Sequence, residues 1–284
     1  MKNIKKGIAA VFVAIFTLTS CTEDESVATM NNVTLAFNNT FKGNTIVLGD
    51  ATSTEATVNT SAEGQVHHFS ELKYVISNVR LLNSDGIEVA YNVSDLDNGA
   101  TVVDQSKEET LEYVLNNIPV GEYTQIKFGL GIETALNTLD EVSFPSFYAT
   151  AGANDTQMHW EWGTGYRFTK IEGFYGADNN TLSIHSGSTV VGTEGAYTQG
   201  VDAYRDITLS LSENAIVGNN APKIMIDADF DKLLSGEANT ITLGDSNATP
   251  SIHTANNMVL FVDNIGGNGD DNITGMFSVN SVEN

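Results

Sequence analysis

The stretch that decides the fold runs from Phe69 to Leu82 and reads FSELKYVISNVRLL. It is rich in β-branched and aromatic residues, and Tyr74 and Ile76 show the two-residue period of a strand. Asp85-Gly86 follows, before a second apolar run, Ile87-Glu-Val89. Because Asp-Gly between two such runs is typical of a tight turn, these residues predict a β-hairpin.

Similar segments recur along the chain, separated by clusters of Gly, Asn, Asp and Ser. They are Val33–Phe37, Thr45–Leu48, Tyr123–Gly131, Tyr166–Phe174, Ile207–Leu211, Lys223–Asp229 and Met258–Val262. Helix signals are sparse. Lys107–Asn116 and Asp229–Leu234 are expected to form no more than short helical turns, because neither has a sustained apolar stripe at helical spacing. We predict an all-β protein, an antiparallel β-sandwich with long loops and little helix, in one domain over residues 33–284.

Residues 1–20 have the features of a secretory signal. Three lysines precede an apolar run from Ile8 to Leu18, which is shorter than the roughly 20 residues that a membrane-spanning helix needs. Cys21, the only cysteine, follows Leu-Thr-Ser, which resembles the lipobox of bacterial lipoproteins. We expect cleavage before Cys21, lipidation of Cys21 and an acidic tether over residues 21–32. The protein is then an outer membrane lipoprotein that faces the periplasm or the cell surface.

The chain is strongly acidic, with 13 Lys and Arg against 36 Asp and Glu and a formal net charge of −23. Such a surface repels nucleic acid and anionic lipid, so the expected contact with the membrane is the lipid anchor alone. Hydrophobic residues still make up 41% of the chain, which is enough to build a core. We therefore expect a folded domain that binds no nucleic acid.

Several motifs follow one another in a specific order. They are Tyr74-x-Ile76-Ser-Asn78, Asn117–Ile132 with Leu136-Asn137, Trp160-x-Trp162-x-x-Gly165-Tyr166 ending in Glu172-Gly173, Leu182–Gly187 with its His-x-Gly, Ile252–Thr254 and Met276-Phe277. In this order and spacing they resemble the MbnP-like domains, the family of the methanobactin-operon periplasmic protein. The resemblance covers Val33 to Phe277, essentially the whole expected mature domain.

The resemblance implies a β-sandwich that binds copper through histidines and a tryptophan oxidised to a kynurenine. It also implies a di-haem c-type cytochrome as the partner that installs this change. His159, Trp160 and Trp162 lie in the tryptophan motif and His185 in the His-x-Gly motif, so these are the candidate ligands. With Cys21 lipidated, only His and Met remain as soft or imidazole donors for copper. Either tryptophan is a candidate for the oxidation.

His159 is expected to face away from both tryptophans if the segment is extended, because neighbouring side chains of a strand alternate in direction. Among the adjacent pair His67 and His68, only one can face inward. His68 shares the parity of Leu72 and Tyr74, which makes it the inward candidate and a further possible ligand. His253, in a polar loop, is expected to be solvated.

Two acidic groups are candidates for calcium. Asp227, Asp229 and Asp231 recur at a period of two, which places them on one face for as long as the strand lasts. The segment from Asp263 to Asn272, with Asp263 and Asp270, has the Asp, Asn and Gly content of a calcium loop. Neither has the spacing of an EF-hand.

The usual catalytic motifs are missing, including Gly-x-Ser-x-Gly, His-Glu-x-x-His and a phosphate-binding loop. Glu133, Glu161 and Glu172 remain as carboxylates whose pairing a sequence cannot reveal. We predict a binding protein and no enzyme. The alternative to copper is a surface-exposed adhesin or glycan-binding module, for which Tyr197 and Tyr204 are the expected exposed aromatic residues.

Overall fold

The computed structural model describes residues 29–137, 141–152, 156–160, 165–192, 196, 198–244, 251–252, 255–269 and 274–284. The expected signal, Cys21 and residues 22–28 of the expected tether lie outside the described residues, as do Trp162, Tyr197, His253 and Asp270. The end of the expected tether is described, and a strand begins there at Met30. Of the helices within these ranges, none is long and apolar enough to cross a membrane.

Five of the described strands form the first sheet, in the order β16-β14-β1-β2 with β7 also paired to β1. Strand β1 runs parallel to β14, and the other pairs are antiparallel. The strands are β1 (Met30–Phe41), β2 (Asn44–Thr45), β7 (Glu112–Pro119), β14 (Lys223–Asp229) and β16 (Phe277–Glu283). In β14, buried Ile224, Ile226 and Ala228 alternate with half-buried residues, as the sequence predicts.

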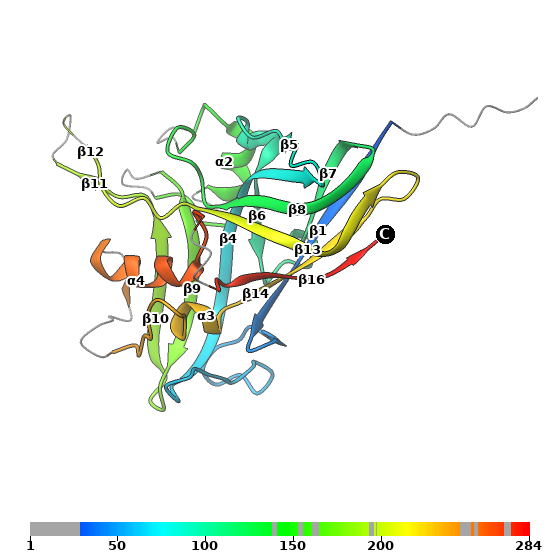
Figure 1. Cartoon of the computed structure of the whole chain (residues 1–284). Helices are drawn as coiled ribbons and strands as arrows, with labels where there is room; N and C mark the ends of the chain where they lie inside the picture. The colour runs from blue at the N-terminus through cyan, green and yellow to red at the C-terminus, as the bar shows by residue number, and fades with distance from the viewer. Residues whose placement is uncertain are drawn as a thin grey trace, which may run out of the picture.

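The second sheet is built around the long strand β4, which crosses the centre of the molecule in Figure 1. Its order is β13-β8-β4-β9-β10-β15, and β3, β5 and β6 also pair with β4. The strands are β3 (Asn59–Thr60), β4 (Val66–Asn83), β5 (Glu88–Tyr91), β6 (Thr101–Asp104), β8 (Gly121–Leu130), β9 (Arg167–Tyr175), β10 (Asn180–Gly187), β13 (Arg205–Val217) and β15 (Ser251–Ile252). The predicted hairpin at Asp85-Gly86 joins β4 to β5, and its Gly86 has a positive φ of 75°.

The remaining elements are short. Strands β11 (Val190–Val191) and β12 (Thr198–Gln199) pair with each other, and the helices are α1 (Leu96–Gly99), η1 (Glu108–Thr110), α2 (Pro145–Ala151), α3 (Asp231–Leu234) and α4 (Ala255–Ile265). The predicted turn at Asp229–Leu234 is α3. The predicted turn at Lys107–Asn116 is limited to η1, since β7 begins at Glu112.

The two large sheets face each other across an aromatic core. Phe37 of β1 and Phe277 of β16 come from the first sheet, and Tyr74 of β4 and Phe128 of β8 from the second. Their ring centroids lie 5.2 to 6.3 Å apart in edge-on pairs, the geometry that aromatic rings prefer. The Tyr74 hydroxyl donates to Asn39 Oδ1 at 2.9 Å, so this buried polar group is satisfied. The all-β sandwich prediction is confirmed.

Three predictions about local structure are wrong. Of the expected strand Thr45–Leu48, only Thr45 belongs to a strand, β2. Met258–Val262 is not a strand but part of helix α4. The buried residues Met258, Phe261, Val262 and Ile265 have the 3, 4, 7 spacing of a helical face, and the short apolar run was too brief to show this period.

The prediction that His68 is the inward-facing residue of the histidine pair is also wrong. The pairing of β4 with β9 shifts register between Phe69 and Glu71, as in a β-bulge, and this changes the alternation along β4. His67 therefore faces the core and is fully buried beside Phe69, whereas His68 is half-buried on the opposite face.

Candidate metal centre

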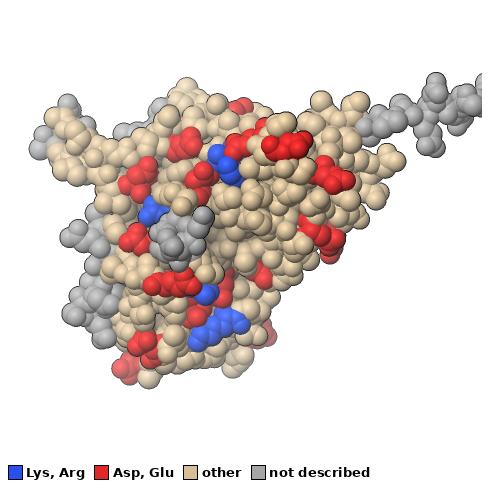
Figure 2. Space-filling model, viewed as in Figure 1, with Lys and Arg blue, Asp and Glu red and all other residues tan. Residues whose placement is uncertain are grey.

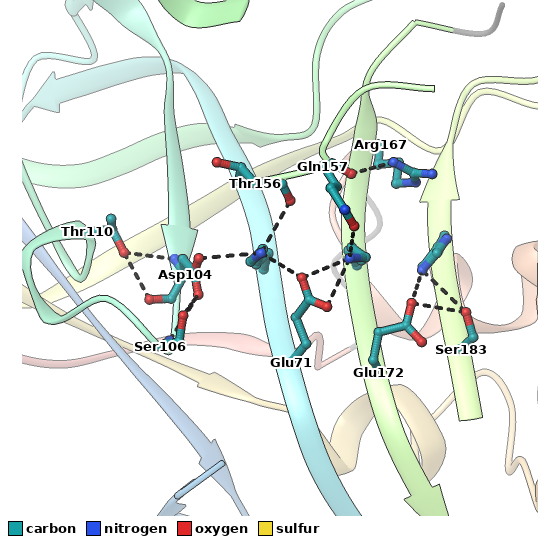
Figure 3. A network of polar contacts seen from close by, with 12 residues as sticks. Glu71, Asp104, Ser106, Thr110, Thr156, Gln157, Arg167, Glu172 and Ser183 are labelled. Atoms are coloured by element: carbon teal, nitrogen blue, oxygen red, sulfur yellow. Dashed lines mark hydrogen bonds and ion pairs between the residues drawn. The ribbon is translucent and has the colours of Figure 1, made fainter. Parts of the chain in front are cut away.

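A row of polar residues crosses four strands on the outer face of the second sheet. Asp104 of β6 pairs with Lys73 of β4, Lys73 with Lys170 of β9, and Lys170 with His185 of β10. All four side chains are buried, which is unusual for charged residues. The row ends at His185, and Figure 3 shows the contacts along it.

The charges within the row neutralise one another. Glu71 lies between the two lysines, with Oε1 2.6 Å from Lys73 Nζ and both oxygens 2.9 Å from Lys170 Nζ. Asp104 Oδ2 lies 3.6 Å from Lys73 Nζ. Buried charges persist only when they are paired in this way.

Three cations of this face hold the segment from Thr156 to Trp160. Lys73 Nζ donates to the Thr156 carbonyl at 3.3 Å, and Lys170 Nζ to Gln157 Oε1 at 3.0 Å. The Arg167 guanidinium donates to the carbonyl of Gln157 and, at 3.0 Å, to that of His159. The polar row thus fixes the segment that carries a histidine and a tryptophan.

The backbone at His159 and Trp160 is extended, with a bridge between His159 and Tyr166. Neighbouring side chains therefore point in opposite directions. The His159 ring packs edge-on against Tyr148 at 5.2 Å and Tyr166 at 4.8 Å, measured between centroids. The expected divergence of His159 from Trp160 is confirmed.

The Trp160 ring faces His185, with their centroids 5.7 Å apart. The Arg167 Cζ atom lies 4.1 Å from the centre of the indole, in the position of a cation–π contact. Gly187 gives the indole room, because a Cβ atom there would lie 3.2 Å from Trp160 Nε1 and 3.0 Å from the Tyr166 carbonyl. This close approach explains the glycine of the His-x-Gly motif.

Glu172 of β9 holds the other side of His185. Its Oε1 atom lies 2.5 Å from His185 Nε2 and accepts a hydrogen bond of 3.1 Å from Ser183 Oγ. Burial raises the pKa of the Glu172 carboxyl, but the hydrogen bond and charge of His185, the hydrogen bond from Ser183 and the charge of Lys170 outweigh it and hold this pKa below its usual value. Ser183 and Glu172 both approach Nε2, so the three residues do not form a Ser-His-acid relay, which uses both ring nitrogens.

The comparisons with known proteins agree with these motifs. A family model described as MbnP matches residues 30–256, well over half of the chain. This chain belongs to the MbnP family. Among solved structures, it is similar to MbnP from Methylosinus trichosporium, with 13% identity over 78% of this chain and 83% of that chain and a TM-score of 0.48. A search of curated proteins finds no match.

In this MbnP-family chain the candidate ligands fall into separate groups. His185 and Trp160 lie together, and His159 projects to the other side of the same segment. His68 pairs with Phe174, and Phe174 with Thr181, four residues from His185 along β10. At 3.3 Å per residue this is about 13 Å along the strand, so His68 lies away from the His185–Trp160 pair.

The candidate calcium residues already bind protein groups. Asp227 accepts from the side-chain amides of Asn38 and Asn280, one at each oxygen. Asp229 Oδ1 accepts from the backbone N–H of Lys42 and of Asp231.

The other two described acids are engaged as well. Asp231 accepts from the Ser235 hydroxyl, and Asp263, which lies in helix α4, forms an ion pair with Arg205 at 3.3 Å. Calcium at either place stays a prediction.

Two residues of the candidate site, Glu172 and Arg167, were not among the ligands expected from the sequence. Glu172 was considered only as a carboxylate without a known partner, and strand alternation does place it on the face of Lys170. Its contact with His185 depends on the pairing register of β9 and β10. Arg167 gave no signal of its own, because cation–π stacking on Trp160 follows from chain folding.

Copper(I) prefers imidazole and soft donors, and of the two rings that meet here only the His185 imidazole is such a donor, because the intact Trp160 indole has no lone pair to offer a metal. Within the part of the chain that the structure describes, no three His, Cys, Asp or Glu residues lie close enough to hold a metal ion. A copper site at His185 therefore fits this chain when Trp160 itself becomes a donor.

Proposed function

We propose that this protein is an envelope lipoprotein that binds copper at the end of β10, with His185 and an oxidised Trp160 as donors. The observation that carries the proposal is the buried pair of rings, 5.7 Å apart between centroids. Membership of the MbnP family supports a periplasmic, methanobactin-associated protein. The signal-like residues 1–20 and the lipobox-like sequence before Cys21 support anchoring in the outer membrane.

We take Trp160 as the residue that is oxidised to a kynurenine, because it packs against a histidine that the described residues hold in place. Two molecules of hydrogen peroxide, used by a partner enzyme of the peroxidase class, would cleave the C2–C3 bond of the indole to give N-formylkynurenine and two molecules of water. Hydrolysis then removes the formyl group as formate and leaves the aromatic amine of kynurenine as a nitrogen donor. We propose that a di-haem c-type cytochrome is the partner that installs it, as the resemblance to the family implies. Bound copper would supply one-electron redox chemistry, and the protein would hold it without catalysing a reaction.

The test compares protein purified from its native envelope with its W160F and W162F variants. We expect copper and a mass change from tryptophan oxidation in the wild type and in W162F, and neither in W160F. H185A should keep the mass change and lose copper. Elemental analysis and intact-mass measurement give both readouts. Native protein with an unmodified mass and no copper would refute the proposal.

A neutral groove between β5 and β7 favours a second candidate function, binding of an uncharged glycan. The groove has a volume of about 580 Å³ and no charged residue in its lining, which comprises Val89, Ala90, Tyr91, Asn92, Asn98, Asn116, Asn117, Ile118 and Pro119. Amide side chains can pair with sugar hydroxyls, and a tyrosine ring offers an apolar face. Tyr204, expected to be an exposed binding residue, is instead half-buried and accepts a hydrogen bond from Asn78.

The glycan candidate is tested on a glycan array, followed by calorimetry with each hit. Binding that N116A/N117A abolishes and H185A leaves intact would support it. An array without hits would count against it.

A further inference from the structure

The contact between Glu172 and His185 determines where the proton of the imidazole lies. An ionised carboxylate can only accept hydrogen bonds, so at 2.5 Å from Glu172 Oε1 the His185 Nε2 atom must be the donor. A neutral imidazole carries one N–H, and its other nitrogen has the lone pair that a metal requires.

Rigid elements hold both partners. Glu172 lies in β9 and His185 in β10, two strands paired through eight residues from Asn180 to Gly187. Glu172 also accepts from Ser183 Oγ at 3.1 Å, and Ser183 is its direct partner across the two strands. On the β4 side Glu172 pairs with Glu71, whose carboxylate is bound by Lys73 and Lys170. The carboxylate therefore has little freedom to leave the imidazole (Figure 3).

We infer that Glu172 is a positioning residue that fixes His185 as its Nε2–H tautomer and so presents Nδ1 as the nitrogen that binds metal. The part concerning metal rests on the proposed function, whereas the tautomer belongs to the metal-free protein. In metal sites a ligating histidine commonly donates its other N–H to a carboxylate, which orients the ring and raises the basicity of the donor nitrogen. The Glu172 carboxylate accepts the N–H of His185 in the same way.

Long-range ¹H–¹⁵N NMR spectra of the protein, isolated from its native envelope on a ¹⁵N source and stripped of metal, test the tautomer. The His185 resonances are identified by their loss in H185A. We expect a proton on Nε2 and none on Nδ1. Addition of buffered Cu(I) should then shift Nδ1 and leave the Nε2 proton in place.

The variant E172A should let both tautomers of His185 become populated and weaken Cu(I) binding by about 10- to 100-fold, the usual effect of removing such a carboxylate. E172D, whose side chain is shorter by one methylene, should restore part of the preference for the Nε2–H tautomer and part of the Cu(I) affinity. E55A removes an exposed glutamate of the segment between β2 and β3 and serves as the matched control. Thermal melting of each variant shows whether the fold is retained.

A proton on Nδ1, a doubly protonated ring, or a Cu(I) shift at Nε2 would overturn the inference. If His185 shows the expected tautomer but Cu(I) shifts no histidine resonance, the proposed copper function and metal binding at Nδ1 are refuted. The same result would confirm that Glu172 fixes the Nε2–H tautomer.

Discussion

His67 is fully buried against the rings of Phe41 and Phe69, with centroids 6.3 and 6.4 Å away. Neither ring nitrogen has a hydrogen-bond partner among the described residues. Burial, and secondarily the charge of His68, lower the pKa of His67 to about 4. The core therefore accepts this side chain only as the neutral imidazole.

His67 should make the folded state sensitive to acid. The unfolded chain, in which the histidine pKa is about 6.5, binds the proton more readily than the folded chain. The stabilising effect of the neutral ring is thus complete above that value and is lost as the pH falls towards 4, by up to about 1.4 kcal/mol per pH unit. H67F removes this titration. Urea unfolding between pH 4.5 and 7 should show a smaller pH slope for H67F, and an unchanged slope would contradict the assignment.

Arg167 should control the environment of Trp160, which it covers at 4.1 Å from the ring centre. R167K keeps the charge but cannot combine planar stacking with donation to two carbonyls. We expect a loss of about 1–2 kcal/mol of stability and a shift in Trp160 fluorescence. Both are measured in a W162F background produced without the cytochrome partner, so that Trp160 is unmodified and is the one tryptophan that reports. R205K, which alters the pair with Asp263, is the matched control and should leave the fluorescence unchanged.

The β-bulge in β4 requires a glycine in the neighbouring strand β9. A Cβ atom at Gly173 would lie 2.0 Å from the His68 carbonyl oxygen and 3.0 Å from the Phe69 backbone. The two strands are paired at this point, so neither backbone can move without breaking the ladder. Gly173 thus permits the close approach of β9 to the bulge that turns His67 toward the core.

The variant G173A should therefore destabilise the protein by about 1–3 kcal/mol or more, as overpacking of a rigid contact does. Gly218, which has open space around its Cβ position, supplies the control G218A, for which a change within about 0.5 kcal/mol is expected. Chemical denaturation measures both. Equal stability of the two variants would show that β4 and β9 can separate here at little cost.

Over the whole molecule, acidic side chains greatly outnumber basic ones. Figure 2 shows them spread over the visible face, with few Lys and Arg between them. A formal net charge of −23 makes the folded state repel itself, and salt screens this repulsion over a Debye length of about 10 Å at 0.1 M.

Raising the salt concentration from about 10 to 150 mM should therefore raise Tm at pH 7. If screening stabilises the folded state by about 1 kcal/mol, Tm should rise by roughly 2–4 °C for a chain of this size. The same salt step at pH 4, where many carboxylates are protonated, should change Tm less. Calorimetry at the two pH values decides, and a fall of Tm with salt at pH 7 would show that the ion pairs outweigh the repulsion.

The amino-acid pattern alone determined the strand-rich class, the hairpin at Asp85-Gly86 and the alternation of β14. These features depend on residues close together in the chain. The same local pattern, with the order of its motifs, was enough to indicate the MbnP family. The single domain over residues 33–284 and the lipid anchor at Cys21 remain predictions from sequence.

Tertiary structure alone decided which candidate residues meet. The bulge in β4 reversed the parity of His67 and His68, and the helical period of α4 was hidden in a short apolar run. Glu71 contacts Lys170 across 99 positions of sequence, and the register of β9 and β10 brings Glu172 to His185. Register and bulges arise from packing between distant segments, and a shift of one residue moves every side chain to the other face. For this reason the histidine–tryptophan pair became visible only in the folded chain.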